Sequence, residues 1–537
     1  MRTIPIITAP EAGALISDGA VVTVSSSSGL GCPDAVLRGI GERFAATGSP
    51  KGITTVHPIA AGDMFGIAGI DHLVKPGLLR RAIAGSYPSG ASSQAPPRVW
   101  QAIEAGDIEA YNLPSGVLFQ MHRAGAVDQP GVFSKVGLDT FVDPRQQGGR
   151  MNKQTPAEIV SVRELDGDEW LFYEAIRPDV AIIRATTADE WGNLSYEDEG
   201  SVLGALDQAY AAHNNGGIVI AQVKRVAAGG TLSAQTVRVP GILVDAIVVD
   251  PDQLQTTGTP YDPAISGQIR RPLATLQDVD WSIEKVIARR AAMELKAGEI
   301  VNLGFGISAL IPRILVEERM DSAVTWVIEQ GAVGGVPLTG MAFGCAVNSQ
   351  ALMPSIDQFT LLQGGGFDHA MLSFLEIDRA GNVNVHCLPG RRHVTAGIGG
   401  FADIVAKAPT IVFSGMFTAG GADVGVEHEQ VTIRTDGRHT KLVEQVREIS
   451  FSGKRALETG QRVIYVTDRC VMELHPEGVT VTEVFPGIDL RSDVLERADF
   501  ELRVAEDLRE GDRRLFRPEA MGLELIDAGL PEANVQA

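Results

Sequence analysis

The sequence has few cysteines, few basic residues and no long apolar run. Its four cysteines are spread over 537 residues without a CxxC pair: Cys32, Cys345, Cys387 and Cys470. That spacing argues against a disulfide framework or a zinc site and favours reduced thiols, so we expect no metal. No apolar run is long enough for a membrane-spanning helix, and the start, Met1–Pro5, has no signal-peptide pattern. We therefore expect a cytoplasmic protein without a membrane partner.

Basic residues are scarce as well. Lys and Arg number 46 against 67 Asp and Glu, which gives a net charge of −21. A nucleic-acid partner needs a basic face, so the charge argues against one. An anionic ligand must then be met by local cations or by backbone N–H groups.

Several catalytic signatures are also missing. The chain has no GxSxG, no GxxxxGK[ST] and no HExxH motif. Gly29-Leu30-Gly31 lacks the third glycine of a dinucleotide-binding fingerprint, so it is weak support for NAD binding.

Glycine, in contrast, is abundant. The 60 glycines form short clusters at the ends of apolar runs, a distribution typical of ligand-binding loops in α/β folds. The content of 44% hydrophobic and 21% charged residues is that of a globular protein. A chain of this length exceeds one hydrophobic core, so we expect two large domains.

Three sequence features recur in the same order and indicate an internal duplication. Each half has a helix, turn, strand and glycine loop; then a strand, an acidic turn and Gly-Asn; then a strand with Ala-Gly-Gly. The matching segments are Asp18–Cys32 and Ala297–Gly306, Ile182–Asn193 and Phe374–Asn382, and Ile218–Gly230 and Ile411–Gly421. The first half holds roughly 90 additional residues between its first two features.

The alternation of strand and helix patterns predicts two similar open α/β domains with mainly parallel sheets and an active site between them. We expect an N-terminal domain over residues 1–275, a C-terminal domain over 283–520 and a tail over 521–537. The boundary falls in the polar, proline-containing stretch Arg270–Trp281.

The most informative single residue is Glu329. It ends the apolar run Thr325–Ile328 and is followed by the glycine-rich turn Gly331–Gly335. Ligands of α/β proteins gather beyond the carboxyl ends of strands, so this carboxylate is a candidate nucleophile or base. The alternative is a strand-end glutamate that caps a helix or faces solvent.

Further glycine loops follow in the same half. Gly364–Asp368 and Gly397–Phe401 both come after apolar or strand-like runs. Backbone N–H groups in such loops stabilise an oxyanion or bind phosphates. One glutamate with backbone donors and no metal cluster favours acyl chemistry in which the carboxylate attacks.

These residues resemble a known family over nearly the full chain. The sequence is similar to the long, fused form of family I CoA-transferases, the acetate/propionate and 3-oxoacid CoA-transferase group. Besides the Glu329 turn, the segments that carry the resemblance are Tyr111–Leu118, Val142–Gly149, His213–Gly217, Val249–Gln253, Gly364–Asp368 and Phe451–Lys454.

The resemblance implies a CoA-transferase/ribose-5-phosphate-isomerase-like fold and a covalent mechanism. Glu329 is then the nucleophile, the Gly400 N–H an oxyanion donor and Asn302 a neighbour of the nucleophile. CoA moves between short-chain carboxylic acids through a glutamyl-CoA thioester, with ping-pong kinetics. The CoA site is expected at Gly304, Gly306 and Gly399, and we add the loop glycines Gly364 and Gly365. CoA or acyl-CoA is a substrate and covalent intermediate, with no permanently bound cofactor.

Two positions depart from the family pattern. Ser25, Ser26 and Ser27 stand where the family has Gly-Gly-Phe, and Ser115 stands where relatives commonly have Gln. We expect these serines, with Gly31, to line the acid-substrate pocket. Arg145 either pairs with a substrate carboxylate or forms a salt bridge that holds a domain interface.

Three other functions remain open at this point. An acyl-CoA hydrolase uses the same glutamate with water as the acceptor. A lyase or decarboxylase transferase subunit uses a carrier-protein thiol. A non-catalytic ligand sensor on this fold normally brings a DNA-binding segment, and the sequence has no basic segment of that kind. The resemblance leads us to expect a homodimer or homotetramer.

Overall fold

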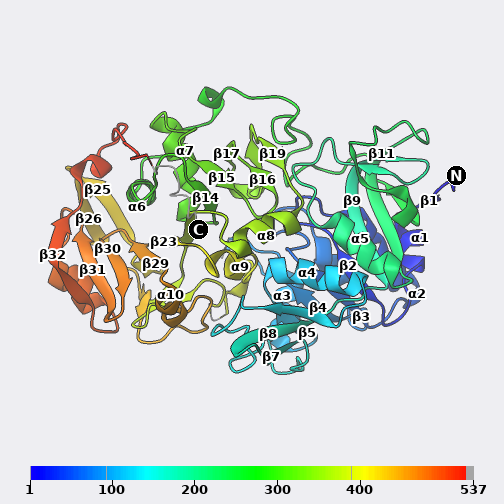
Figure 1. Cartoon of the computed structure of the whole chain (residues 1–537), viewed down its shortest axis with the longest axis horizontal. Helices are drawn as coiled ribbons and strands as arrows, with labels where there is room; N and C mark the ends of the chain where they lie inside the picture. Colours follow the sequence, from blue (N-terminus) through cyan, green and yellow to red (C-terminus); the bar gives the residue numbers. More distant parts are fainter. Residues whose placement is uncertain (1, 92, 389, 528–537) are drawn as a thin grey trace, which may run out of the picture.

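The computed structural model describes residues 2–91, 93–388 and 390–527, and it contains two large sheets side by side (Figure 1). We call residues 2–269 the N-terminal half and residues 283–527 the C-terminal half. Of the predicted tail, residues 528–537 lie outside the described residues. Within the described ranges, no helix is long and apolar enough to cross a membrane.

The sheet of the N-terminal half has an eight-strand parallel path. In spatial order its strands are β1 (Ile6–Ile7), β13 (Ala246–Val249), β11 (Ile218–Ala227), β9 (Val180–Asp189), β2 (Val21–Val24), β3 (Ile53–His57), β4 (Leu79–Ala84) and β5 (Glu109–Asn112). Two short antiparallel strands join it, β10 (Leu194–Ser195) and β12 (Val237–Val239). All ten residues of β9 are buried, as expected for a parallel strand covered on both faces.

Helices cover this first sheet, and a small sheet is attached to it. The helices are α1 (Ala9–Ala14), α2 (Asp34–Thr47), α3 (Arg98–Ala105), α4 (Ser115–Ala126) and α5 (Ala205–Asn214). The small antiparallel sheet has the order β6 (Gly131–Ser134), β8 (Asp168–Glu174), β7 (Val160–Leu165). It belongs to the additional residues that the sequence predicted for this half.

The sheet of the C-terminal half is mixed. Its order is β19 (Ala351–Leu352), β16 (Ala332–Val333), β15 (Thr325–Val327), β14 (Ile300–Leu303), β20 (His369–Ser373), β23 (Thr410–Ser414), β29 (Arg462–Val466), β30 (Cys470–His475), β31 (Gly478–Val484) and β32 (Arg503–Glu510). The five strands from β15 to β29 are parallel. The helices are α6 (Ile283–Ala292), α7 (Ile311–Glu317), α8 (Ser355–Gly364), α9 (Phe401–Val405) and α10 (Gly453–Thr459).

Short pairs of strands complete the C-terminal half. They are β17 (Val336–Pro337) with β18 (Ala346–Val347), β24 (Thr418–Ala419) with β27 (His439–Thr440), β25 (Asp423–Glu427) with β26 (Gln430–Thr435), and β21 (Glu376–Asp378) with β22 (Val383–Asn384) and β28 (Leu442–Val443). Residues 521–527 pack against this half: the Met521 N–H donates to Glu318 Oε1 at 2.7 Å, and Asp527 forms a β-bridge with Ala297.

The predicted duplication is visible in the strand order. The path β3-β2-β9-β11-β13 of the first sheet has the same arrangement as β15-β14-β20-β23-β29 of the second. The Gly-Asn turns also match in detail. Asp189 Oδ1 accepts the Asn193 N–H at 2.9 Å, and Asp378 Oδ1 accepts the Asn382 N–H at 3.0 Å. Asparagine then caps a distant glycine N–H at 2.9 Å in both halves, Gly241 and Gly453.

These buried aspartates are expected to stabilise the two halves equally. Asp189→Ala and Asp378→Ala each leave buried backbone donors without an acceptor, which costs about 1–3 kcal/mol. We expect both variants to lower the midpoint of urea unfolding. The control is Asp278→Ala, because Asp278 is exposed and makes no hydrogen bond or ion pair with the described residues. A control shift as large as that of the two variants contradicts this assignment.

Candidate active site

Glu329 lies at the tip of a tight turn at the carboxyl edge of the second sheet. The turn is closed by the Gly331 N–H, which donates to the Ile328 carbonyl at 2.8 Å. A β-carbon on Gly331 would lie 2.0 Å from the Met353 carbonyl oxygen, and its φ is +127°, so only glycine fits there. The sequence thus fixes a carboxylate at the sheet edge where ligands bind in open α/β folds.

Two serines of the N-terminal half form hydrogen bonds with Gln330, the residue after Glu329. The Gln330 carbonyl accepts the Ser201 hydroxyl, and it also accepts the Ser355 hydroxyl at 3.1 Å. The Gln330 side chain donates from Nε2 to Ser27 Oγ at 3.3 Å. Ser27 follows β2 and Ser201 follows β10, so loops of the N-terminal half position the Glu329 turn.

A second segment of the C-terminal half, residues 397–399, is hydrogen-bonded to and packed against the N-terminal half. The Ile398 N–H donates to Asn112 Oδ1 at 2.8 Å, and the Gly399 N–H donates to the Gly85 carbonyl at 2.7 Å. A β-carbon on Gly397 would come within 2.8 Å of Asn112. Gly85 and Asn112 stand at the carboxyl ends of β4 and β5. The backbone before α9 is therefore fixed by the ends of two strands of the other half.

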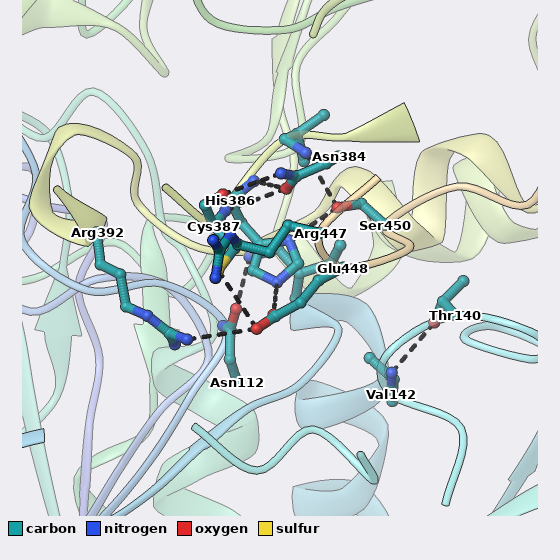
Figure 2. A network of polar contacts seen from close by, with 12 residues as sticks. Asn112, Thr140, Val142, Asn384, His386, Cys387, Arg392, Arg447, Glu448 and Ser450 are labelled. Carbon is teal, nitrogen blue, oxygen red and sulfur yellow. Dashed lines mark hydrogen bonds and ion pairs between the residues drawn. The ribbon is translucent and has the colours of Figure 1, made fainter. Parts of the chain in front are cut away.

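A buried polar cluster anchors the beginning of this segment (Figure 2). His386 Nε2 lies 2.8 Å from Glu448 Oε2, and its Nδ1 lies 2.7 Å from Ser450 Oγ. Cys387 and Arg392 also reach Glu448 Oε1, each at 3.3 Å. Burial opposes ionisation of Glu448, but hydrogen bonding and charge from His386, with Arg392, lower its pKa to about 2. The Glu448 carboxyl group thus holds His386, Cys387 and Arg392 together.

The segment brings Gly400 against the Glu329 carboxyl group. A β-carbon on Gly400 would lie 3.4 Å from Glu329 Cδ and 2.8 Å from the Phe359 ring. Gly400 is the N-cap of α9, and no oxygen in the described part of the chain accepts its N–H. An unpaired N–H beside a carboxyl group is suited to stabilising negative charge on a reacting oxygen.

The environment of Glu329 raises its pKa to about 7. Burial contributes most, because it disfavours the charged form, and the negative charge of Asp403 adds to it. Asp403 is itself fully buried in α9, and burial raises its pKa to about 7 as well. Two acidic groups thus share a region in which a second negative charge is disfavoured.

Comparisons with known proteins agree with this geometry. Residues 6–250 match the family model described as coenzyme A transferase. The chain is 39% identical to acetate CoA-transferase YdiF of Escherichia coli K12 over 528 residues, which is 98% of this chain and 97% of that protein. It is also 39% identical to caffeate CoA-transferase of Acetobacterium woodii, over 97% of this chain and 99% of that protein.

The chain belongs to the coenzyme A transferase family. A crystal structure of the Escherichia coli O157:H7 enzyme YdiF as a thioester complex with CoA matches it with a TM-score of 0.90 and 38% identity, over 98% of both chains. The predicted family and the fold of two α/β halves are confirmed, and the protein is a CoA-transferase.

Three residues predicted near the nucleophile and CoA lie at the same sheet edge in this CoA-transferase. Asn302 on β14 is buried and donates from Nδ2 to the Val327 carbonyl at 2.9 Å, two residues before Glu329. Gly304 and Gly306 follow β14 beside the end of β20. A β-carbon on Gly306 would be 2.7 Å from Ser373 Oγ.

Gly364 and Gly365 lie elsewhere. They end α8, where Gly365 forms the left-handed C-cap with φ +76°, and they precede the amino end of β20. The structure therefore places them at the sheet edge opposite Glu329. A glycine run that ends a helix and one that receives a ligand look alike in a sequence.

The predicted acid-pocket residues are all placed in the N-terminal half. Ser26 Oγ donates to the Ala60 carbonyl at 2.8 Å, and Ser115 Oγ donates to the Pro58 carbonyl at 2.6 Å. Ser25 is buried beside β9, and a β-carbon on Gly31 would meet Leu203 at 2.7 Å. Of this group, Ser27 is the residue that reaches the Glu329 turn.

Arg145 pairs within the N-terminal half, with Asp143 at 2.7 Å and Glu169 at 2.9 Å. Arg145 therefore forms a salt bridge, as one of the two alternatives expected, but its partners lie in its own half and not across a domain interface. Sequence reasoning missed Gln330 and Asp403. An aspartate in the first turn of a helix is common and carries no signal of a site.

The space at Gly400 gives a test. Gly400→Ala places a methyl group against Phe359 and Glu329, although its φ of −79° suits alanine. We expect CoA transfer to slow by about 10- to 100-fold, because a shift of about 1 Å in reacting groups has that effect. Steady-state kinetics measure it, with thermal unfolding as the check on folding. The matched control is Gly400→Ala/Phe359→Leu, which makes room for the methyl group and should recover part of the rate. A wild-type rate in Gly400→Ala contradicts the close approach.

Proposed function

We propose that this CoA-transferase carries CoA on Glu329 as a covalent thioester and passes it between short-chain carboxylic acids. A carboxylate oxygen of Glu329 attacks the acyl-CoA carbonyl carbon. The C–S bond breaks, and CoA leaves as a thiolate. The product is a mixed anhydride between Glu329 and the acyl group.

The thiolate then attacks the Glu329 carbonyl carbon. The C–O bond of the anhydride breaks, and the first acid leaves as a carboxylate. A second carboxylate runs both steps in reverse and leaves as acyl-CoA. No step consumes water, so the activated acyl bond is conserved, and ping-pong kinetics follow from the covalent intermediate.

One observation carries this proposal: the carboxyl carbon of Glu329 lies against Gly400, whose N–H is unpaired in the described part of the chain. That N–H is suited to the tetrahedral oxyanions of both steps, and Asn302 supports the strand before Glu329. The exposed Phe305 between Gly304 and Gly306 provides an apolar surface at the same edge for CoA.

The proposal also includes the acid substrate and the half of the protein that binds it. The relatives carry acetate and caffeate in their names, and the departures at Ser25–Ser27 and Ser115 lie in the half that we propose for the acid. A cytoplasmic location and a homodimer or homotetramer complete the proposal.

Intact mass spectrometry tests the covalent step. The wild-type protein mixed with acyl-CoA should gain the mass of CoA less one water, and Glu329→Gln should not, because its amide is a poor nucleophile. Asp357→Asn is the control, since Asp357 is an acid on α8 that pairs with Arg123 at 3.5 Å; this variant should keep the adduct. Turnover by a wild-type protein that never shows the adduct would falsify the proposal.

The pH dependence of kcat/KM gives a second test. Glu329 must be ionised to attack, and its pKa is raised from 4.5 to about 7. The rate should therefore be highest above pH 7 and fall by about tenfold per unit below it. A profile that stays flat down to pH 5 contradicts a raised pKa at the nucleophile.

A further inference from the structure

Helix α4 begins without a cap of its own. Its N-cap is Pro114, which makes no side-chain hydrogen bond to the helix, and the Ser115 hydroxyl is used by the Pro58 carbonyl. The first N–H groups of a helix need acceptors from elsewhere when they are buried. Two acceptors come from the C-terminal half. The Ser115 N–H donates to the Gly399 carbonyl at 2.9 Å, and the Gly116 N–H donates to Asp403 Oδ2 at 2.9 Å.

The position of Asp403 is fixed on its other side as well. Gln363 on α8 donates from Nε2 to Asp403 Oδ1 at 2.7 Å, and its own Oε1 accepts Gln120 Nε2 of α4 at 2.7 Å. A β-carbon on Gly116 would lie 2.7 Å from Asp403 Oδ1 and 2.8 Å from Gln363 Nε2. Three helices from two halves therefore meet at one buried carboxyl group, which leaves no room for a β-carbon at Gly116.

Asp403 also lies close enough to Glu329 to act on it electrostatically. The titratable side chains around it are Glu329, which follows β15, and Tyr173 on β8. Burial raises the pKa of both groups, and the negative charge of Asp403 raises each of them further. From α8 the neighbours are Gln363 and the apolar Phe359, which a β-carbon on either Gly116 or Gly400 would meet. Asp403 lies three residues after Gly400 on the same helix, so its contacts also place Gly400.

We propose that Asp403 is a positioning residue for CoA transfer: by capping α4 it holds Gly400 against Glu329, and its negative charge opposes a second charge on Glu329. This inference rests on the proposed role of Glu329 as nucleophile. It assigns Asp403 no bond to substrate.

The arrangement links the reaction cycle to the contact between the halves. Glu329 loses its charge when it becomes an anhydride or a thioester, so a negative charge on Asp403 is then no longer opposed by one on Glu329. A charged carboxylate binds the α4 N–H groups and the helix dipole more strongly than a neutral one. The contact between the halves is therefore strongest while the covalent intermediate exists, when entry of water causes hydrolysis.

Asp403→Asn tests this inference, because it keeps the shape of the side chain and removes the charge. We expect the acid limb of the kcat/KM profile to move to lower pH by about one unit. We also expect kcat to fall by about 10- to 100-fold with a much smaller change in KM, since Asn has one acceptor oxygen where Asp403 uses two. An acid limb at the wild-type pH overturns the proposal, whatever the loss of kcat.

Two variants separate charge from packing. Asp378→Asn alters an equally buried carboxylate in the acidic turn of the C-terminal half, so it should lower stability and leave the acid limb in place. Gly116→Ala presses on Asp403 and Gln363 without removing the charge, so it should lower kcat and move the limb by less than Asp403→Asn does. An acid-limb shift in Asp378→Asn as large as that in Asp403→Asn also overturns the proposal.

Gln363→Leu covers the case in which Asp403→Asn does not fold. Loss of the Gln363 hydrogen bond disfavours the charged form of Asp403, so the acid limb should again move to lower pH, by less than one unit; an unmoved limb overturns the proposal. Failure of the proposed function looks different, because the wild-type protein then lacks the CoA adduct.

Discussion

The capping of α4 by the C-terminal half is the interaction on which the site depends. The first turn of this helix has no acceptor of its own, and it obtains two from the segment Gly399–Asp403. The same segment carries Gly400 to the Glu329 carboxyl group. Neither half can therefore complete the site alone: one supplies the carboxylate and the glycine, and the other fixes both of them.

The duplication explains how this division of roles arises. The two sheets share a five-strand order, and β3 in the first half corresponds to β15 in the second. β15 leads to Glu329, whereas β3 ends at His57, which is fully buried and whose pKa burial lowers to about 4. The strand end of the first half is thus kept neutral. Its next residue, Pro58, accepts the Ser115 hydroxyl and so supports α4.

Sequence patterns predicted the fold, the duplication and the place of Glu329, because these depend on local order. Apolar runs, turn residues and glycines recur in the same order in each half, and each pattern involves only residues that are close in the sequence. The role of Asp403 depends on a contact between residues 116 and 403, and no local pattern encodes it. Gly364 and Gly365 show the opposite case. Their glycine pattern predicted a ligand loop, but in the structure these residues end α8 at the sheet edge opposite Glu329.

The raised pKa of Glu329, to which the charge of Asp403 contributes, suits a carboxylate that must serve as nucleophile and leaving group in turn. A more basic carboxylate attacks a thioester better but is ionised in a smaller fraction of molecules near pH 7. Because part of the rise in the pKa of Glu329 comes from the charge of Asp403, that part disappears on acylation. The free carboxylate is destabilised while the covalent state is not, so the repulsion favours formation of the intermediate. A purely apolar pocket lacks this release, and it also provides no cap for α4.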